Sequence, residues 1–144
     1  MIGNSCLFDA CSILTIIRQL RGDAAEKLVQ GSTTSLAYYE IGNALWRECF
    51  LLKRISQEET EKLLKTIYPI LAEMDTSQVE DEAEASAVLV LACKFNLTFY
   101  DASYLSEAVR AKKTLVTEDK KLAKATKDAG AETLTSNVFI QHFL

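Results

Sequence analysis

The sequence predicts an α/β fold in which a short parallel sheet is covered by helices on both faces. In the second half of the chain, strand-like segments alternate with segments of helical character, which is typical of parallel sheets. The predicted strands are short apolar runs without a clear period of two, as expected for strands buried on both faces. The 144 residues are 49% hydrophobic and include one proline. We therefore expect one domain over residues 1–144, with a real core.

The first third of the chain predicts two strands and three helices. Residues 5–9 form a short apolar run and are predicted as a buried strand. Apolar residues then recur at helical spacing as far as Gly22, where that helix should end. The elements predicted next are a short helix over 23–30, a brief strand over 33–35 and a helix over 36–54.

Two capping-box patterns predict the helices of the middle third. Ser56, followed three residues later by Glu59, should begin a helix that Pro69 stops. Ser77 should begin a second, alanine-rich helix that reaches residue 95. The remaining predicted elements are strands at 70–74, 97–100, 114–117 and 132–134, and helices at 101–112, 119–129 and 136–143.

Composition argues against several classes of protein. The formal net charge of −4 counts against a large, stable nucleic-acid interface, although a bound cation and a local basic patch would still allow brief contact with RNA. The chain starts without a basic leader, and no segment approaches the roughly 20 apolar residues of a membrane span. We expect a cytoplasmic protein with no membrane contact. The four cysteines lack metal-ligand spacing and are interpreted as small, reduced, buried residues.

Four acidic residues lie at the edges of apolar segments: Asp9, Glu40, Asp101 and Asp119. Three of them stand at or just after predicted strand ends, and Glu40 lies in the first turns of a helix that follows a strand. The carboxyl ends of parallel strands meet at one edge of a sheet, which is where such folds bind ligands. Four carboxylates gathered there would repel one another. A divalent cation is the usual remedy, and phosphate chemistry is its usual use.

Each acid also has a purely structural interpretation. Asp101 and Asp119 could simply stabilise the N-terminal turns of helices, and Glu40 could lie on the solvent-exposed face of its helix. Asp9 is harder to explain in this way, because it lies between an apolar strand and an apolar helix with no basic neighbour. We expect Asp9 and Asp101 to be direct metal ligands, whereas Asp119 is the acid most open to a water-mediated or capping role.

The chemistry of these acids suits Mg²⁺ or Mn²⁺, which prefer hard oxygen ligands and keep several waters. Two such ions about 4 Å apart activate a water and stabilise the leaving oxygen of a phosphodiester. Such a site needs no histidine base, and we assign the one histidine, His142, a surface or packing role. Asn43 shares a helix face with Glu40, and Thr117 is placed either to hold a metal-bound water or to cap the next helix.

Motifs in the chain resemble those of the PIN-domain family. FDACSILTI resembles the first motif and YYEIGNALW the second, in which an asparagine follows a glutamate by three residues. LTFYDASYLSEAVRAKKTLVTEDKKLA resembles the third and fourth motifs joined together, and it is the most specific of these segments. The resemblance spans nearly the whole chain, in the right order.

The resemblance implies a three-layer α/β/α sandwich and a metal-dependent endoribonuclease, with the length of a VapC-type toxin. It implies an RNA substrate, a protein antitoxin and a homodimer, for which apolar residues around Ile13, Leu14 and Ile17 and the 36–50 segment offer surface. Asp9, Glu40, Asp101 and Asp119 match the family's acidic quartet, and Asn43 and Thr117 match its supporting polar positions.

One position departs from the family pattern. Cys11 stands where the family often has serine, threonine or asparagine, and its thiol is a poor partner for a hard cation. Either the neighbouring Ser12 takes over after a small backbone adjustment, or the contact is dispensable.

The sequence allows more than one role for the basic residues and more than one function for the chain. Lys120, Lys121 and Lys124 recur on the helix after Asp119 and are candidates for phosphate contacts, although a solvated helix face also explains them. Besides a ribonuclease, the sequence allows a catalytically inactive PIN-like binding module. It also allows a phosphatase with Asp9 as nucleophile, although such enzymes usually have a second aspartate where this chain has Cys11.

Overall fold

The computed structural model describes residues 5–142, and the chain folds around a five-stranded, all-parallel sheet. The strand order is β3-β2-β1-β4-β5. The strands are β1 (Cys6–Phe8), β2 (Ser32–Thr34), β3 (Asp75–Ser77), β4 (Thr114–Val116) and β5 (Thr133–Leu134). The carboxyl ends of the central strands β2, β1 and β4 therefore lie side by side.

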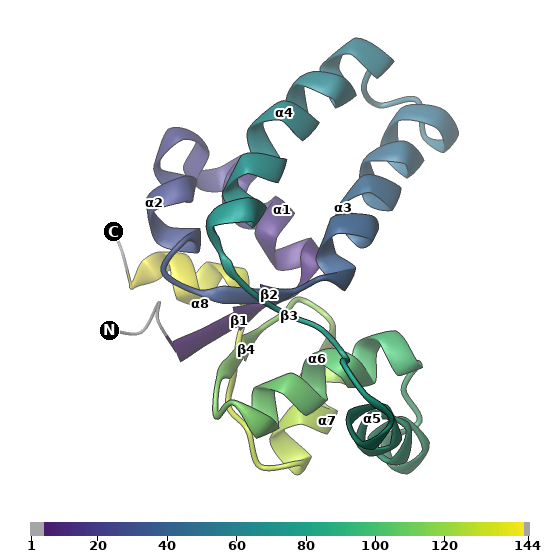
Figure 1. The fold of residues 1–144 in the computed structure, drawn as a ribbon. Helices are drawn as coiled ribbons and strands as arrows, with labels where there is room; N and C mark the ends of the chain where they lie inside the picture. The colour runs from purple at the N-terminus through teal and green to yellow at the C-terminus, as the bar shows by residue number, and fades with distance from the viewer. Residues whose placement is uncertain (1–4, 143–144) are drawn as a thin grey trace.

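Helices cover both faces of the sheet, so the predicted three-layer architecture is confirmed (Figure 1). The first layer contains α1 (Ala10–Leu20), α2 (Ala24–Leu28), α3 (Leu36–Trp46), α4 (Gln57–Glu73) and α8 (Ser136–Gln141). The second contains α5 (Glu82–Phe95), α6 (Phe99–Arg110) and α7 (Lys120–Asp128). A 3₁₀ turn over Arg21–Asp23 precedes α2, and a π-helical turn over Arg47–Leu51 extends α3.

Strand β1 joins the two cores, because its side chains alternate between the faces of the sheet. Cys6 and Phe8 pack into the cluster beneath α1, α3 and α4, whereas Leu7 packs against α6 and α7. Both faces are buried, which is why this strand reads as an uninterrupted apolar run. The sequence left open whether Ile13, Leu14 and Ile17 of α1 belong to a dimer surface or to the core, and the structure buries all three in this core.

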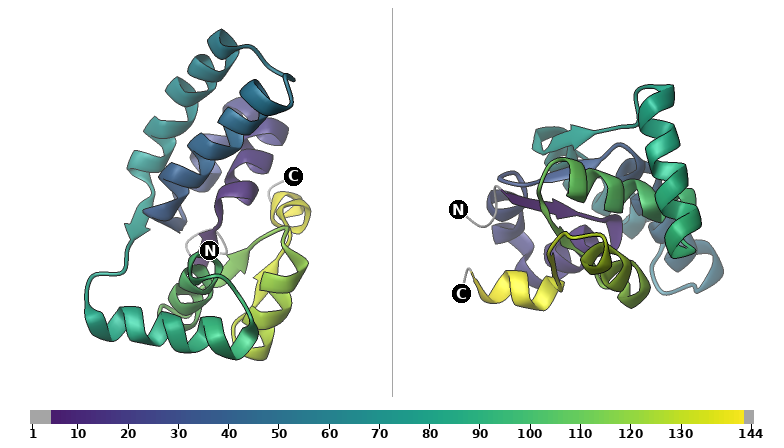
Figure 2. Two further views of the ribbon diagram at one scale, coloured as in Figure 1. Left: turned by 90° about the vertical axis from the view of Figure 1, so that its right-hand side faces the viewer. Right: turned by 90° about the horizontal axis from the view of Figure 1, so that it is seen from below.

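Helices α3 and α4 pack together and extend beyond the sheet (Figure 2). Leu45 of α3 and Ile67 of α4 are buried in the same core cluster, and the Tyr68 hydroxyl donates a hydrogen bond to the Tyr38 carbonyl. Contrary to the sequence prediction, Pro69 does not stop α4, which continues to Glu73. Burial of Ile70 and Leu71 on the core side outweighs the hydrogen bond that proline cannot make.

Three further predictions about elements were wrong. Residues 70–73 continue α4 and do not form the predicted strand over 70–74. Residues 97–100 do not form a strand either: Thr98 caps α6 by accepting a hydrogen bond from the backbone of Asp101, so the helix begins at Phe99. Helix α5 begins at Glu82 and not near Ser77, which lies in β3. Its cap is Asp81, whose side chain accepts a hydrogen bond from the Glu84 backbone.

The cysteines were predicted as buried, and this holds for only part of the set. None of the four forms a disulfide; Cys6 is buried and Cys49 half-buried, whereas Cys11 and Cys93 are exposed. Within residues 5–142, no helix is long and apolar enough to span a membrane.

Candidate active site

Asp9 lies directly after β1 and caps α1. Its Oδ1 accepts a hydrogen bond from the Ser12 backbone N–H at 2.9 Å and a second one from the Ser12 hydroxyl. Thr117, at the end of the neighbouring strand β4, donates another hydrogen bond to the carboxylate. Asp9 is only 8% exposed, and this burial raises the pKa of its carboxyl above the ordinary value. The chain therefore holds a largely desolvated carboxylate in one fixed orientation.

Glu40 lies in the second turn of α3 and faces α6. The Tyr104 hydroxyl donates a hydrogen bond to its Oε1 at 2.8 Å. Partial burial, together with the negative charges of Asp9 and Asp101, raises the pKa of the Glu40 carboxyl. The pKa of Tyr104 is also raised, chiefly by burial, so the phenol stays protonated and keeps donating.

Asp101 and Asp119 stand in the first turns of two helices of the opposite layer. Burial and the charges of Asp119 and Asp9 raise the pKa of the half-buried Asp101 carboxyl. Asp119 is the N-cap of α7, and its Oδ1 accepts a hydrogen bond from the Leu122 backbone at 3.0 Å. Asp101 of α6 therefore lies within electrostatic range of both Asp9 and Asp119.

The charges of all four acids reach the thiol of Cys11, in the first turn of α1. Although the Cys11 residue is exposed as a whole, partial burial of its thiol raises the thiol pKa, and the four negative charges raise it further. We call these four carboxylates the acidic site; they are Asp9, Glu40, Asp101 and Asp119. Within residues 5–142, no group of three or more His, Cys, Asp or Glu side chains lies in an arrangement that would hold a metal ion without some side-chain movement.

The three predicted supporting residues have different surroundings. Ser12 is buried in the first turn of α1, where its backbone and its hydroxyl both donate to Asp9, the N-cap of the helix. Asn43 is exposed on α3, one turn beyond Glu40. Thr117 does not cap α7, a role that belongs to Asp119; it accepts a hydrogen bond from the Asp119 backbone at 3.1 Å.

The predicted basic residues divide between two faces of α7. Lys121 is the one whose positive charge lowers the pKa of Asp101, so it lies on the side of the acidic site. Lys120 and Lys124 line a hollow on the other side of the helix, next to β5. Arg18 of α1 forms an ion pair with Glu48 at 2.5 Å.

Sequence reasoning missed two residues that shape the site. Tyr104 belongs to the Tyr-Leu pair of the third motif, but nothing in the sequence showed that its hydroxyl reaches Glu40. Glu118 accepts a hydrogen bond from the Ser136 backbone at 2.6 Å, which ties the loop carrying Thr117 and Asp119 to the start of α8. Such long-range contacts have no local sequence signal.

The residues of the acidic site suit Mg²⁺ or Mn²⁺. All four offer hard carboxylate oxygens. Burial raises the pKa of the Asp9, Glu40 and Asp101 carboxyls, and such groups favour an added positive charge. The positive charge of Lys121 lowers the pKa of the Asp101 carboxyl and so partly offsets the effect of burial. These ions keep several waters, so an arrangement short of a closed cage still suits them.

Comparisons with known proteins agree with this fold. No family model matches the chain. The sequence is 37% identical over 94 residues to the exonuclease VapC9 of Pyrobaculum aerophilum, and the match spans 65% of this chain and 65% of that relative. The crystal structure of PAE2754 from Pyrobaculum aerophilum matches with a TM-score of 0.74 at 26% identity, covering 95% of both chains.

A second solved structure, FitAcB from Neisseria gonorrhoeae, matches with a TM-score of 0.59 over 91% of this chain and 97% of that one. At 13% identity it supports the fold alone. The sequence match to VapC9 and the nearly full-length structural match to PAE2754 agree with the PIN-like motifs and the parallel sheet described above. In sequence and in fold, the chain is similar to the VapC-type PIN-domain proteins.

Proposed function

We propose that this chain, working as one domain over residues 1–144, is a divalent-metal-dependent endoribonuclease and the toxin of a toxin–antitoxin pair. The observation that carries the proposal is the convergence of four carboxylates from four separate elements. The charges of Asp9 and Asp119 both raise the pKa of Asp101, and those of Asp9 and Asp101 raise that of Glu40. Unpaired like charges of this kind are typical of functional sites.

Asp9, Glu40, Asp101 and Asp119 are the residues that would hold Mg²⁺ or Mn²⁺. When bound, the metal would supply the charge that activates a water and stabilises the leaving oxygen of an RNA phosphodiester. Direct coordination of this set is our proposal, with one oxygen of Asp9 and one of Asp119 already engaged in helix caps.

The other contributions come from the chain itself. Thr117 donates to Asp9 and accepts from the Asp119 backbone, so it fixes these two acids relative to each other. Tyr104 sets the orientation of Glu40. Lys121 places a positive charge near Asp101, where a phosphate would approach. We propose Ser12, Asn43 and Thr117 as supporting residues of the site.

The test uses a circular single-stranded RNA beside a linear RNA of the same sequence, with Mg²⁺ or Mn²⁺. An endonuclease opens the circle, whereas an exonuclease, the activity in the name of VapC9, degrades only the linear RNA. We expect the parent chain to open the circle and Asp9→Asn to lose nearly all cleavage. Asparagine still caps α1, so the variant should stay folded.

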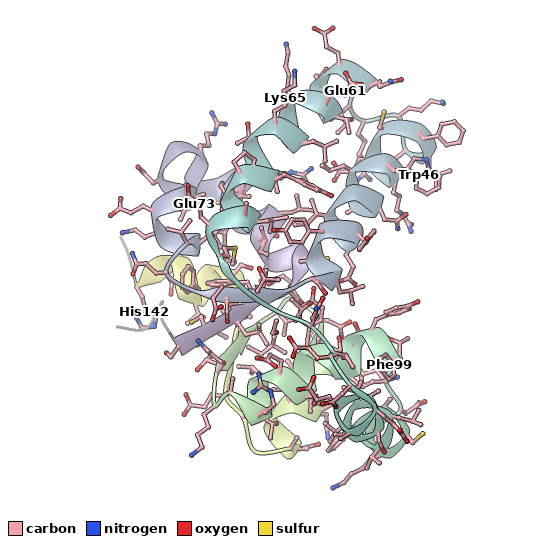
Figure 3. All side chains as sticks on the ribbon, viewed as in Figure 1. Trp46, Glu61, Lys65, Glu73, Phe99 and His142 are labelled. Atoms are coloured by element: carbon pink, nitrogen blue, oxygen red, sulfur yellow. The ribbon has the colours of Figure 1, made fainter. Side chains whose placement is uncertain are left out.

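Glu61→Gln is the matched control, because Glu61 is an exposed carboxylate on the far part of α4 (Figure 3). Its cleavage rate should equal that of the parent. Equal rates for Asp9→Asn and the parent would show that the acidic site does not cut RNA. No cleavage and no metal binding by the parent would identify an inactive binding module. A phosphorylated Asp9 would identify a phosphatase.

We also propose a protein antitoxin that blocks the acidic site with a basic side chain, for which the four carboxylates supply the electrostatic reason. We propose a homodimer as well, and its surface must differ from the buried residues of α1. Apolar side chains on α5 and α6 are exposed around a hollow of about 710 Å³. They include Val90, Phe99 and Val109. We place the dimer contact on this α5–α6 face.

A further inference from the structure

A hollow of about 440 Å³ runs beside α7, between this helix, β5 and the start of α8. One wall carries three lysines of α7, and the other carries threonines of β5 and of the α8 cap. We call it the α7 groove, and its charged or polar lining residues include Lys120, Lys124, Lys127, Thr133 and Thr135. This row of cations stands out on a chain whose formal net charge is −4.

Helix geometry explains the row. Positions 120, 124 and 127 are four and three residues apart, so their side chains project from one face of α7. Leu122, Ala125 and Thr126 occupy the buried face of the same helix. At 1.5 Å of rise per residue, the three lysines span about 10 Å, so the row is long enough to follow a few nucleotides of a strand.

The α7 groove begins at the acidic site. Thr117 lines the groove, and the same residue donates a hydrogen bond to Asp9 and accepts one from the Asp119 backbone. Lys120 follows Asp119 directly and is the first lysine of the row. A polymer that reaches the carboxylates with one phosphate can therefore continue into the groove with the next.

The lysines are available to a ligand. The Lys124 side chain is 80% exposed, and its ion pair with Asp128 at 3.1 Å joins two exposed groups on the same helix. Exposed pairs of this kind contribute little to stability, so a phosphate readily replaces the carboxylate. Lys121, on the other side of α7, faces Asp101 and does not belong to the row.

We propose that the backbone of a single-stranded RNA leaves the acidic site along the α7 groove, where Lys120, Lys124 and Lys127 bind successive phosphates. This inference rests on the proposed ribonuclease function and adds the path of the substrate. Phosphate contacts of this kind position the strand without reading its sequence.

The test measures binding of a fluorescein-labelled, single-stranded 20-nucleotide RNA over a series of salt concentrations. Asp101→Asn serves as the background, so that the RNA stays intact. In that background Lys124→Gln and Lys127→Gln are combined, because each removes a charge from the groove. The slope of log affinity against log salt should become shallower by about 0.7 for each phosphate that the protein no longer neutralises, or about 1.4 for the pair.

The matched control combines Lys62→Gln and Lys65→Gln, which remove the same charge from exposed positions of α4. Figure 3 shows Lys65 on the part of α4 that lies away from the sheet, and α7 lies on the opposite side of the sheet (Figure 1). This pair should keep the slope of the background protein. Equal slopes for both lysine pairs would overturn the groove proposal.

An acidic protein segment is the competing occupant, and a 20-residue polyglutamate peptide tests it. The peptide is compared with the RNA at the same total charge. If it displaces the RNA, and if Lys124→Gln with Lys127→Gln weakens binding of the peptide as much as binding of the RNA, the groove is a protein-docking surface and the RNA path is wrong. Failure of the proposed function has a separate signature, since the parent chain would then neither cut nor bind RNA. If the parent chain cuts RNA but the Lys124→Gln/Lys127→Gln variant has the same salt slope as the Lys62→Gln/Lys65→Gln control, only the proposed RNA path is wrong.

Discussion

Tyr104 shows how one residue outside the acidic site controls an acid within it. Its ring is 1% exposed, and its hydroxyl donates to Glu40 at 2.8 Å. This hydrogen bond favours the charged form of Glu40, opposing the burial that raises the pKa of the carboxyl. We therefore regard Tyr104 as a positioning residue that keeps Glu40 ionised and correctly oriented.

Tyr104→Phe should move the acidic limb of the pH–rate profile to higher pH. Without the donor the pKa of Glu40 rises further, so a higher pH is needed to ionise it. We expect metal affinity to fall about tenfold and the free energy of unfolding to fall by about 1 kcal/mol. Tyr68→Phe is the control: it removes a hydroxyl that bonds the Tyr38 carbonyl and should leave the pH limb in place. An unmoved limb in Tyr104→Phe would exclude the positioning role.

The acids should also give the metal-free protein a distinctive pH dependence. Burial and mutual repulsion raise the pKa of Asp101 above its ordinary value of 3.8. A raised pKa in the folded state means that its contribution to stability is fully present below the unfolded pKa and is lost as the pH rises through the folded one. The stability of Asp101→Asn relative to the parent should therefore increase above about pH 4.

Urea unfolding in EDTA at pH 4 and pH 8 measures this difference. The free energy of unfolding of Asp101→Asn should exceed that of the parent by a larger amount at pH 8 than at pH 4. Glu61→Gln, which alters an exposed carboxylate on α4, corrects for a general change in charge. A gap that does not depend on pH would show that Asp101 experiences no net repulsion.

At the scale of elements, the N-terminus of α7 combines a structural role with a proposed chemical one. The carboxylate of Asp119 caps the helix, and its charge also reaches Asp101. Asp119→Asn keeps the cap and removes the charge, whereas Asp119→Ala removes both. Both variants should lose cleavage, and only the alanine variant should lose about 1 kcal/mol of unfolding free energy. Full cleavage by Asp119→Asn would limit Asp119 to capping.

Elements marked by local chemistry could be predicted from the sequence. Strands β1 and β4 are apolar runs, and Asp9 and Asp119 follow them closely, so the corner positions of these acids could be foreseen. The Ser56 cap of α4 was also predicted correctly, because Ser56 accepts from the Glu59 backbone.

Elements for which two sequence features favour different structures could not be predicted in this way. The aromatic run at 97–100 favours a strand, but the Thr98 cap begins a helix there. Pro69 favours a helix end, but core burial of its neighbours carries α4 past it. The hydrogen bond from Tyr104 to Glu40 joins residues 64 positions apart, and no local pattern encodes it.

At the scale of the whole molecule, exposed apolar side chains mark two candidate dimer contacts. Val90 is 61% exposed on the α5–α6 face, and Phe50 is 61% exposed in the segment that the sequence favoured. If the proposed homodimer forms through this face, Val90→Glu should be a monomer in light scattering at micromolar concentration, because an unpartnered charge is costly to bury there. Phe50→Glu should remain a dimer. The reverse outcome would place the contact at the end of α3.

Binding of Mn²⁺ tests most directly whether the four acids act as one site. Titration followed by electron paramagnetic resonance compares the parent chain with Asp9→Asn, Glu40→Gln, Asp101→Asn and Asp119→Asn, and with the distant control Glu61→Gln. We predict that each of the four variants binds Mn²⁺ more than about tenfold less tightly than the parent, while the control binds equally. Affinity at the parent level in Asp9→Asn and Asp101→Asn would contradict a shared metal site.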